Sequence, residues 1–114
     1  MSADCIFCRI IAGELPAQMV ARTDHWAAFP DIAPKTPVHV LVVPTAHVEG
    51  MHEVDLLSAE ARAEMPGFIA DVARRTGVEG SGYRVTSNTG PDARQEVTHL
   101  HWHVMGGTLM SSTM

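Results

Sequence analysis

The chain has 114 residues, of which 46% are hydrophobic and 18% are charged, and its formal net charge at pH 7 is −5. This length predicts a single domain over residues 1–114, and the acidic balance argues against nucleic acid or an acidic membrane surface as a partner. No apolar run is long enough to span a bilayer and no signal peptide precedes Cys5, so we expect a cytoplasmic protein.

The predicted elements begin with a short helix over residues 5–12, which Gly13 ends. Two short strands follow over residues 19–22 and 26–29. Residues 38–43 form an almost continuous apolar run between two prolines, which is typical of a strand buried on both faces.

The longest predicted helix lies within residues 55–75, with Ser58 as a plausible cap and Gly77 as a plausible stop. Pro66-Gly67 interrupts its pattern, so we expect either a kink or two helical pieces.

Two more strands are predicted over residues 83–87 and 98–105, with a loop over residues 88–96 between them. The elements together predict an α+β fold, in which an antiparallel sheet of about five strands has one long and one short helix on one side. Such a sheet leaves an edge strand to cover.

Three histidines, His99, His101 and His103, alternate with bulky apolar residues in the last predicted strand. A strand has a period of two, so the three imidazoles should share one face. One interpretation is a single metal ion held by all three, but the outer Cα atoms would lie about 13 Å apart and strain the site. The other is phosphate chemistry, in which one imidazole attacks phosphorus and its neighbours bind the phosphoryl oxygens.

This histidine pattern, followed by Met105-Gly106-Gly107, resembles the signature of the histidine triad (HIT) superfamily, and in particular its Hint branch of small nucleoside phosphoramidases. Residues 5–16, 28–34 and 39–47 also resemble family segments, so the resemblance covers nearly the whole chain. It implies a HIT-like fold and a homodimer in which two sheets join into one.

The resemblance also implies an activity: hydrolysis of the P–N bond that joins AMP or GMP to an amine, through a nucleotidyl-histidine intermediate. Two alternatives stay open. A sister branch hydrolyses dinucleoside polyphosphates, and a nucleotide-binding interaction protein with little turnover would keep the same fold.

The resemblance assigns catalytic roles to three residues. His101 matches the nucleophile, His103 matches a residue that hydrogen-bonds the same phosphate, and Gln95 would orient the leaving group. Asn88 matches a position near the ribose and phosphate, and the backbone N–H of Glu96 would face phosphate oxygens.

For the nucleoside, the resemblance places the Asp31 carboxylate at the ribose hydroxyls. His39 matches a position close to the triad, although a hydrogen-bonded core histidine is nearly as good an interpretation. An apolar slot for the purine would be formed by residues that are each also reasonable core residues: Phe7, Ile10, Phe29 and Ile32.

One segment departs from the family pattern, because Ala93-Arg94 stands where a glycine pair usually precedes the glutamine. Glycine permits positive φ and close backbone approach, and we expect both benefits to be lost here. The Arg94 guanidinium would either reach phosphate or point to solvent.

The two cysteines, Cys5 and Cys8, have the spacing of metal ligands, and a cytoplasmic setting opposes a structural disulfide. Two thiolates and two imidazoles form a common structural zinc shell. Some histidine triad proteins complete such a shell with histidines at the positions of His47 and His99, so the resemblance implies a structural zinc held by these four residues. His101 would stay free to attack, and the chemical step would need no cofactor. The alternative is two free thiols in a short helix.

Overall fold

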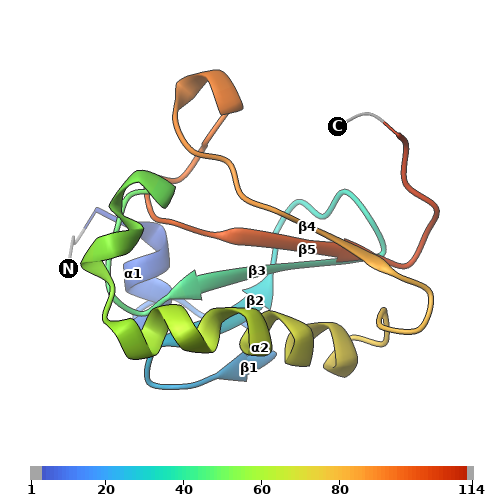
Figure 1. The fold of residues 1–114 in the computed structure, drawn as a ribbon, viewed down its shortest axis with the longest axis horizontal. Helices are drawn as coiled ribbons and strands as arrows, with labels where there is room; N and C mark the ends of the chain where they lie inside the picture. The colour runs from blue at the N-terminus through green and yellow to red at the C-terminus, as the bar shows by residue number, and fades with distance from the viewer. Residues whose placement is uncertain (1–3, 113–114) are drawn as a thin grey trace.

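One antiparallel sheet organises the protein, whose structure, a computed structural model, describes residues 4–112 (Figure 1). Its five strands lie in the order β1-β2-β3-β5-β4. The predicted α+β fold with about five antiparallel strands is therefore confirmed. The strand bounds are Ala21–Arg22 for β1, Trp26–Pro30 for β2, Val38–Pro44 for β3, Tyr83–Thr86 for β4 and Trp102–Gly106 for β5.

Two α-helices cover opposite faces of this sheet. Helix α1 spans Ile6–Ile11 and helix α2 spans Ala59–Arg75. Two 3-10 segments accompany them, η1 over Met51–Leu56 and η2 over Pro91–Ala93. In Figure 1, α2 crosses in front of the strands and α1 lies behind them. The prediction that the helices lie on one side of the sheet is wrong.

Strand β3 explains why both faces are covered. Val40 and Val42 belong to the core that α2 completes, whereas Leu41 and Val43 belong to the core that α1 completes. A strand with large apolar side chains on both faces exposes one set to water unless each face is covered. One helix on each face meets that requirement.

Helix α2 runs through Pro66 as a single element. Ser58 caps its first turn, as predicted, and Gly77, with φ +80°, follows its last turn. Proline inside a helix costs about 3 kcal/mol. Burial of Phe68 and Val72 in the core outweighs this cost. Of the two predicted alternatives, the division into two helical pieces is therefore wrong, and the kink stays a prediction.

Strand β5 is shorter than predicted. It begins at Trp102, four residues later than expected, because β3 ends at Pro44, which has no N–H to donate to the next rung. Leu100 donates its N–H to the carbonyl oxygen of Val48 at 2.7 Å instead. The alternation nevertheless persists. Leu100 and Val104 are buried on the α2 side, and the three histidines face the α1 side.

The remaining boundaries differ from the prediction by a few residues. Strand β1 keeps only the last two of residues 19–22, and β4 ends one residue before Ser87. Helix α1 lies within residues 5–12, and Gly13, with φ +81°, follows it as predicted. No helix within residues 4–112 is long and apolar enough to cross a membrane.

Candidate active site and metal cluster

The middle histidine, His101, is held in one tautomer by the backbone. Its Nδ1 lies 2.8 Å from the carbonyl oxygen of His99. A carbonyl oxygen can only accept a hydrogen bond, so Nδ1 carries the proton and Nε2 keeps a free lone pair. An imidazole nitrogen in this state can attack an electrophile at neutral pH.

Two neighbours fix the position of His101. Ser87 Oγ donates to the backbone carbonyl oxygen of His101 at 2.7 Å. The Phe7 ring meets the imidazole edge to face, with 5.2 Å between the ring centroids. The sequence gives Ser87 no functional signal, because its hydroxyl bonds a backbone group that becomes a neighbour only once β4 and β5 pair.

His39 and His103 form a hydrogen-bonded pair whose direction follows from a backbone amide. The Lys35 N–H donates to His39 Nδ1 at 3.1 Å, so the proton of a neutral His39 ring sits on Nε2. That nitrogen lies 2.9 Å from His103 Nδ1 and 3.5 Å from Asp31 Oδ2. Because His103 accepts at Nδ1, its own proton sits on Nε2, where it is free to bond a ligand.

Burial keeps these imidazoles neutral. Desolvation lowers the pKa of His103 to about 4, and the neighbouring imidazoles contribute to the shift. Desolvation also lowers the pKa of His39, and the Asp31 carboxylate opposes the shift at both residues. The pKa of His99 falls to about 4, chiefly because the ring is buried. At neutral pH these rings therefore offer lone pairs and N–H groups rather than charges.

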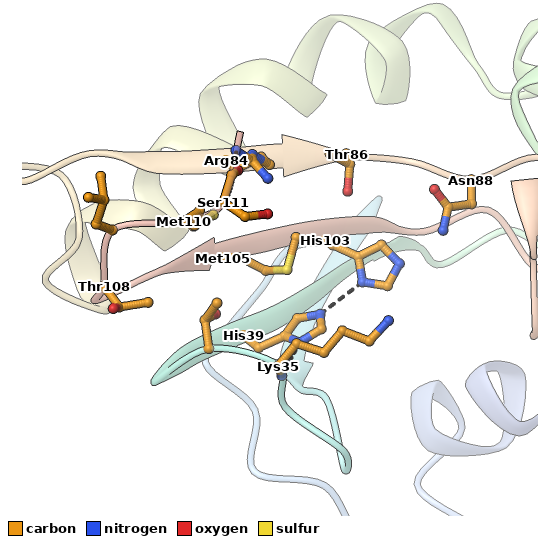
Figure 2. Close-up of a pocket in the computed structure, with 12 residues that line it drawn as sticks. Lys35, His39, Arg84, Thr86, Asn88, His103, Met105, Thr108, Met110 and Ser111 are labelled. Carbon is orange, nitrogen blue, oxygen red and sulfur yellow. Dashed lines mark hydrogen bonds between the residues drawn. The ribbon is translucent and has the colours of Figure 1, made fainter. Parts of the chain in front are cut away.

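A cavity of about 400 Å³ opens beside His103 (Figure 2). His39 and Asn88, both predicted to lie near the phosphate or the triad, line the same cavity. Asp31 reaches this group through His39, and its Oδ1 accepts the N–H of Ala33 at 2.9 Å. Asp31, His39 and His103 could together ligate a metal ion, since their donor atoms lie within 4.8 Å of one another. Hydrogen bonds already account for that grouping.

The four residues predicted to form an apolar purine slot divide into two sets. Phe7 and Phe29 are buried and touch edge to face, with 5.6 Å between centroids, so both belong to the core under α1. Ile10 is half-buried at the margin of that core. Ile32 is 96% exposed beside Asp31. The apolar surface open to a ligand comes mainly from these two isoleucines.

The side-chain amide of Gln95 forms hydrogen bonds within the protein. Its Oε1 accepts the N–H of Gly90 at 2.9 Å, and its Nε2 donates to the carbonyl oxygens of Glu49 and Val97 at 2.6 and 3.0 Å. Both amide hydrogens are therefore used within the protein. The neighbouring Glu96 is exposed.

Arg94 adopts a backbone conformation that glycine favours, with φ 62° and ψ 39°. It is the one non-glycine residue with positive φ among residues 4–112. The expectation that a positive φ is lost at Ala93-Arg94 is therefore wrong. A non-glycine residue in this conformation costs about 1 kcal/mol of folding stability. The Arg94 side chain is exposed.

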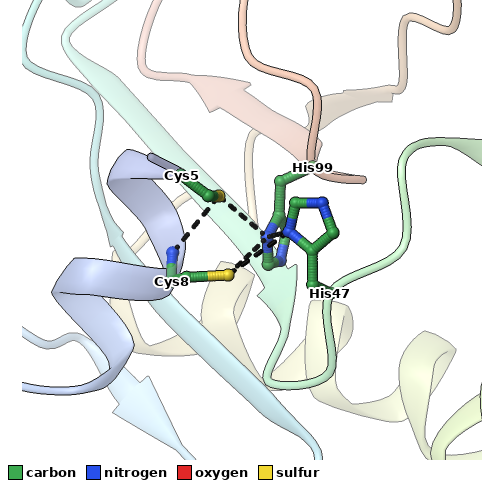
Figure 3. A group of neighbouring side chains, drawn as sticks. All are labelled: Cys5, Cys8, His47 and His99. Carbon is green, nitrogen blue, oxygen red and sulfur yellow. Dashed lines mark hydrogen bonds between the residues drawn. The ribbon is translucent and has the colours of Figure 1, made fainter. Parts of the chain in front are cut away.

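A second cluster lies where α1 approaches the segment before β5 (Figure 3). It consists of the four predicted metal ligands, whose donor atoms all lie within 4.8 Å of one another: Cys5, Cys8, His47 and His99. The Cys5 Sγ lies 3.3 Å from His99 Nδ1, and the Cys8 Sγ lies 3.3 Å from His47 Nδ1. Residues separated by up to 94 positions thus meet at one point.

The spacing of this cluster fits a tetrahedral zinc ion. Ligand atoms about 2.0–2.3 Å from zinc lie about 3.5 Å from one another. Four of the distances between the Sγ and Nδ1 atoms of this cluster are 3.0–3.6 Å. His99 Nε2 faces the carbonyl oxygen of Pro44 at 2.9 Å, so it carries the proton and Nδ1 offers its lone pair to the cluster. The residues present therefore fit a structural zinc.

Comparisons with known proteins agree with this geometry. A family model described as HIT domain matches residues 12–110. The chain is 35% identical over 107 residues to the purine nucleoside phosphoramidase of Escherichia coli (strain K12), which covers 94% of this chain and 90% of the relative. It is 43% identical over 105 residues to a HIT-like protein of Azospirillum brasilense, covering 90% and 84% of the two chains. The solved HIT family hydrolase from Clostridium thermocellum superposes with a TM-score of 0.93 at 34% identity, covering 100% of this chain and 99% of that one.

Proposed function

This chain belongs to the histidine triad (HIT) family, and we propose that it is a hydrolase of purine nucleoside 5′-phosphoramidates that acts through a nucleotidyl-histidine intermediate. The observation that carries the proposal is the 2.8 Å contact between His101 Nδ1 and the His99 carbonyl oxygen. It leaves the lone pair of Nε2 as the only nucleophilic atom of a ring placed between two other histidines.

In the first step, His101 Nε2 attacks the α-phosphorus and the P–N bond breaks. The nitrogen keeps the electron pair of that bond, takes up a proton and leaves as the amine. The nucleotidyl-imidazolium that forms keeps its Nδ1–H on the His99 carbonyl, which stabilises the new positive charge. In the second step, water attacks phosphorus, releases the nucleoside monophosphate and returns neutral His101.

His103 supports both steps through its Nε2–H. The bond from His39 directs this proton outward, where it can stabilise the charge that develops on a phosphoryl oxygen. A neutral donor suits this task, because a cationic ring would have to be desolvated first. Asn88 lines the same cavity and adds a side-chain amide beside the phosphate.

The nucleoside would lie on the side of Asp31. The Asp31 carboxylate accepts hydrogen bonds from two vicinal ribose hydroxyls, and the exposed side chain of Ile32 beside it covers one face of the purine. Ile10 contributes apolar surface at the margin of the α1 core. Phe7 and Phe29 support this slot from within the core rather than by open contact.

A structural zinc at Cys5, Cys8, His47 and His99 would serve the same mechanism indirectly. A bound zinc ion would link α1 to the segment before β5, and it would take no part in the reaction at phosphorus. The residue that offers Nδ1 to the cluster, His99, is the residue whose carbonyl holds the tautomer of His101. The cluster thereby stabilises the position of the nucleophile.

Assembly follows from the unpaired edge of the sheet. Strand β4 is last in the strand order, and within residues 4–112 it pairs only with β5. We infer a homodimer in which two sheets join, with β4 as the longer of the two free edges. Light scattering on a sizing column tests it, and a monomer at all concentrations would exclude it. The cytoplasmic location stays a prediction.

A turnover panel tests the proposed activity. It compares an adenosine phosphoramidate, a guanosine phosphoramidate and a diadenosine polyphosphate at equal concentration. Preferred cleavage of the phosphoramidates is the expected result. Preferred cleavage of the polyphosphate would indicate the activity of the sister branch instead. Turnover of none of the three compounds would indicate a nucleotide-binding protein without this activity.

A further inference from the structure

The cavity beside His103 continues beyond the residues assigned to the nucleoside. It runs along β5 and β4 toward residues 108–111 (Figure 2). Neither His101 nor Asp31 lines it, whereas His103 does. The rings of His101 and His103 are 5.0 Å apart between centroids. A group that leaves phosphorus opposite the attacking His101 would depart on this side.

The charge of the cavity is opposite to that of the protein. Among residues 4–112, two cations, Lys35 and Arg84, line the cavity and no carboxylate side chain does, in a chain whose net charge is −5. Lys35 forms no ion pair within residues 4–112. Arg84 donates one N–H to the carbonyl oxygen of Ser111 at 2.9 Å, which is its one hydrogen bond to the described part of the chain outside β4 pairing. The cavity therefore favours an anionic ligand.

The two cations occupy different parts of the cavity. The Lys35 side chain extends past His39 at the end nearer His103, whereas Arg84 lies at the far end beside Ser111 (Figure 2). Lys35 is close enough to His103 to contribute to the lowering of its pKa. An anionic group one or two bonds from the leaving nitrogen would meet Lys35 first.

The rest of the lining is suited to hydrocarbon. Met105, Leu109 and Met110 contribute apolar side chains to the lining. A polyphosphate chain would place charged oxygens against these residues and lose their hydration. An amine with a short carbon skeleton and a carboxylate matches both the apolar wall and the cations. A volume of about 400 Å³ is sufficient for such a group.

We propose that this cavity binds the leaving group and selects amines that carry a carboxylate, with Lys35 as the residue that recognises it. This inference rests on the proposed phosphoramidase function and names its substrate class as nucleoside phosphoramidates of amino acids. When the P–N bond breaks, the nitrogen keeps the electron pair and takes up a proton from water in the cavity. The amino acid is then free of phosphorus while its carboxylate is still paired to Lys35.

Matched substrates test the proposal. Adenosine 5′-phosphoramidates of alanine and of alanine methyl ester differ only in the charge of the carboxyl group. We expect wild type to show about tenfold higher kcat/KM for the acid than for the ester. Lys35→Gln should bring that ratio close to one. Arg62→Gln removes an exposed cation from helix α2, on the other face of the sheet, and should keep the wild-type ratio.

The outcomes separate the two proposals. Turnover of both substrates with a ratio near one in wild type, or an unchanged ratio in Lys35→Gln, would overturn the leaving-group inference alone. Turnover of neither substrate would overturn the proposed function and this inference with it. Faster cleavage of a diadenosine polyphosphate than of the alanine conjugate would show that the cations bind phosphate instead.

A binding measurement gives a readout besides activity. Lys35 is the only lysine of the sequence, so reductive ¹³C-methylation labels one side chain and the terminal amine, and it retains the charge. In the His101→Ala variant, the alanine conjugate should shift the Lys35 methyl signal, whereas the ester should shift it much less. Equal shifts with both compounds, or no shift with either at saturation, would contradict the assignment.

Discussion

Replacing His39 with leucine tests the hydrogen-bonded chain that orients His103. In the native protein the Lys35 N–H bonds His39 at 3.1 Å, and His39 bonds His103 at 2.9 Å. Leucine fills similar space but neither accepts nor donates a hydrogen bond. His103 Nδ1 then has no donor, so both tautomers become accessible and Nε2 no longer always carries the proton. We expect kcat to fall more than KM rises.

The size of the effect follows from what an oriented proton contributes. A positioned proton donor accelerates a reaction typically about 10²–10⁴-fold. His103 is half-buried, so the lower part of that range applies. We expect kcat to fall about 10- to 100-fold, which corresponds to about 1.4–2.7 kcal/mol in the transition state. The Lys35 N–H left without its acceptor should cost a further 1–3 kcal/mol or so of folding stability.

His39→Gln is the matched control, because its Nε2 amide group can still donate to His103. Steady-state kinetics with an adenosine phosphoramidate should show most of the wild-type kcat in this variant and the full loss in His39→Leu. Urea unfolding of each variant separates misfolding from a catalytic defect. A folded His39→Leu protein with at least half of the wild-type kcat would refute the orientation argument, as would an equal loss in the glutamine variant.

Three further results are expected. Metal analysis of chelator-free protein should find about one zinc per chain, and Cys5→Ala should lower Tm by roughly 10 °C while lowering turnover less; protein without metal would defeat this. Asp31→Asn should raise KM about tenfold and weaken selection against deoxyribose, through lost hydrogen bonds worth about 1–3 kcal/mol, and unchanged discrimination would show that Asp31 does not read the ribose. The pKa of His103 is about 4 in the folded protein, below its ordinary 6.5, so the stability that the neutral ring contributes is complete above about pH 6.5 and is lost as pH falls toward 4. The free energy of unfolding in urea should therefore change less between pH 7.5 and pH 5 in His103→Gln than in wild type, by about 1–2 kcal/mol. An equal change in the two proteins would contradict the shift.

The sequence was most informative where residue type and spacing act locally. The alternation of histidines with Leu100 and Val104 correctly separates the two faces of the sheet, although the ladder begins only at Trp102. Ser58 and Gly77 mark the ends of α2 because capping is a property of a few neighbouring residues. The apolar run of β3 also indicates burial on both faces. Burial on both faces requires a covering layer on each side of the sheet, which is why the two helices lie on opposite faces.

Long-range geometry was beyond the sequence. The anchor of His101 is the backbone carbonyl of His99, in the segment that precedes the first paired residue of β5. Ser87 bonds a backbone group across two strands. Arg94 shows that a position can keep positive φ without glycine when the surrounding loop is fixed by Gln95. In each case the partner is a backbone atom. Because residues of almost every type carry the same backbone groups, such a contact cannot be predicted from the sequence.

The most direct test of the account is intact-mass spectrometry of protein quenched during turnover of an adenosine phosphoramidate. Wild type should carry one adenylyl group on His101, stable to base and labile to acid, because the lone pair of Nε2 is the attacking atom. His101→Ala should lose both the adduct and turnover while still binding AMP, and His103→Ala should slow turnover without moving the adduct. An adduct that persists in His101→Ala, or turnover retained in that variant, would contradict covalent catalysis by His101.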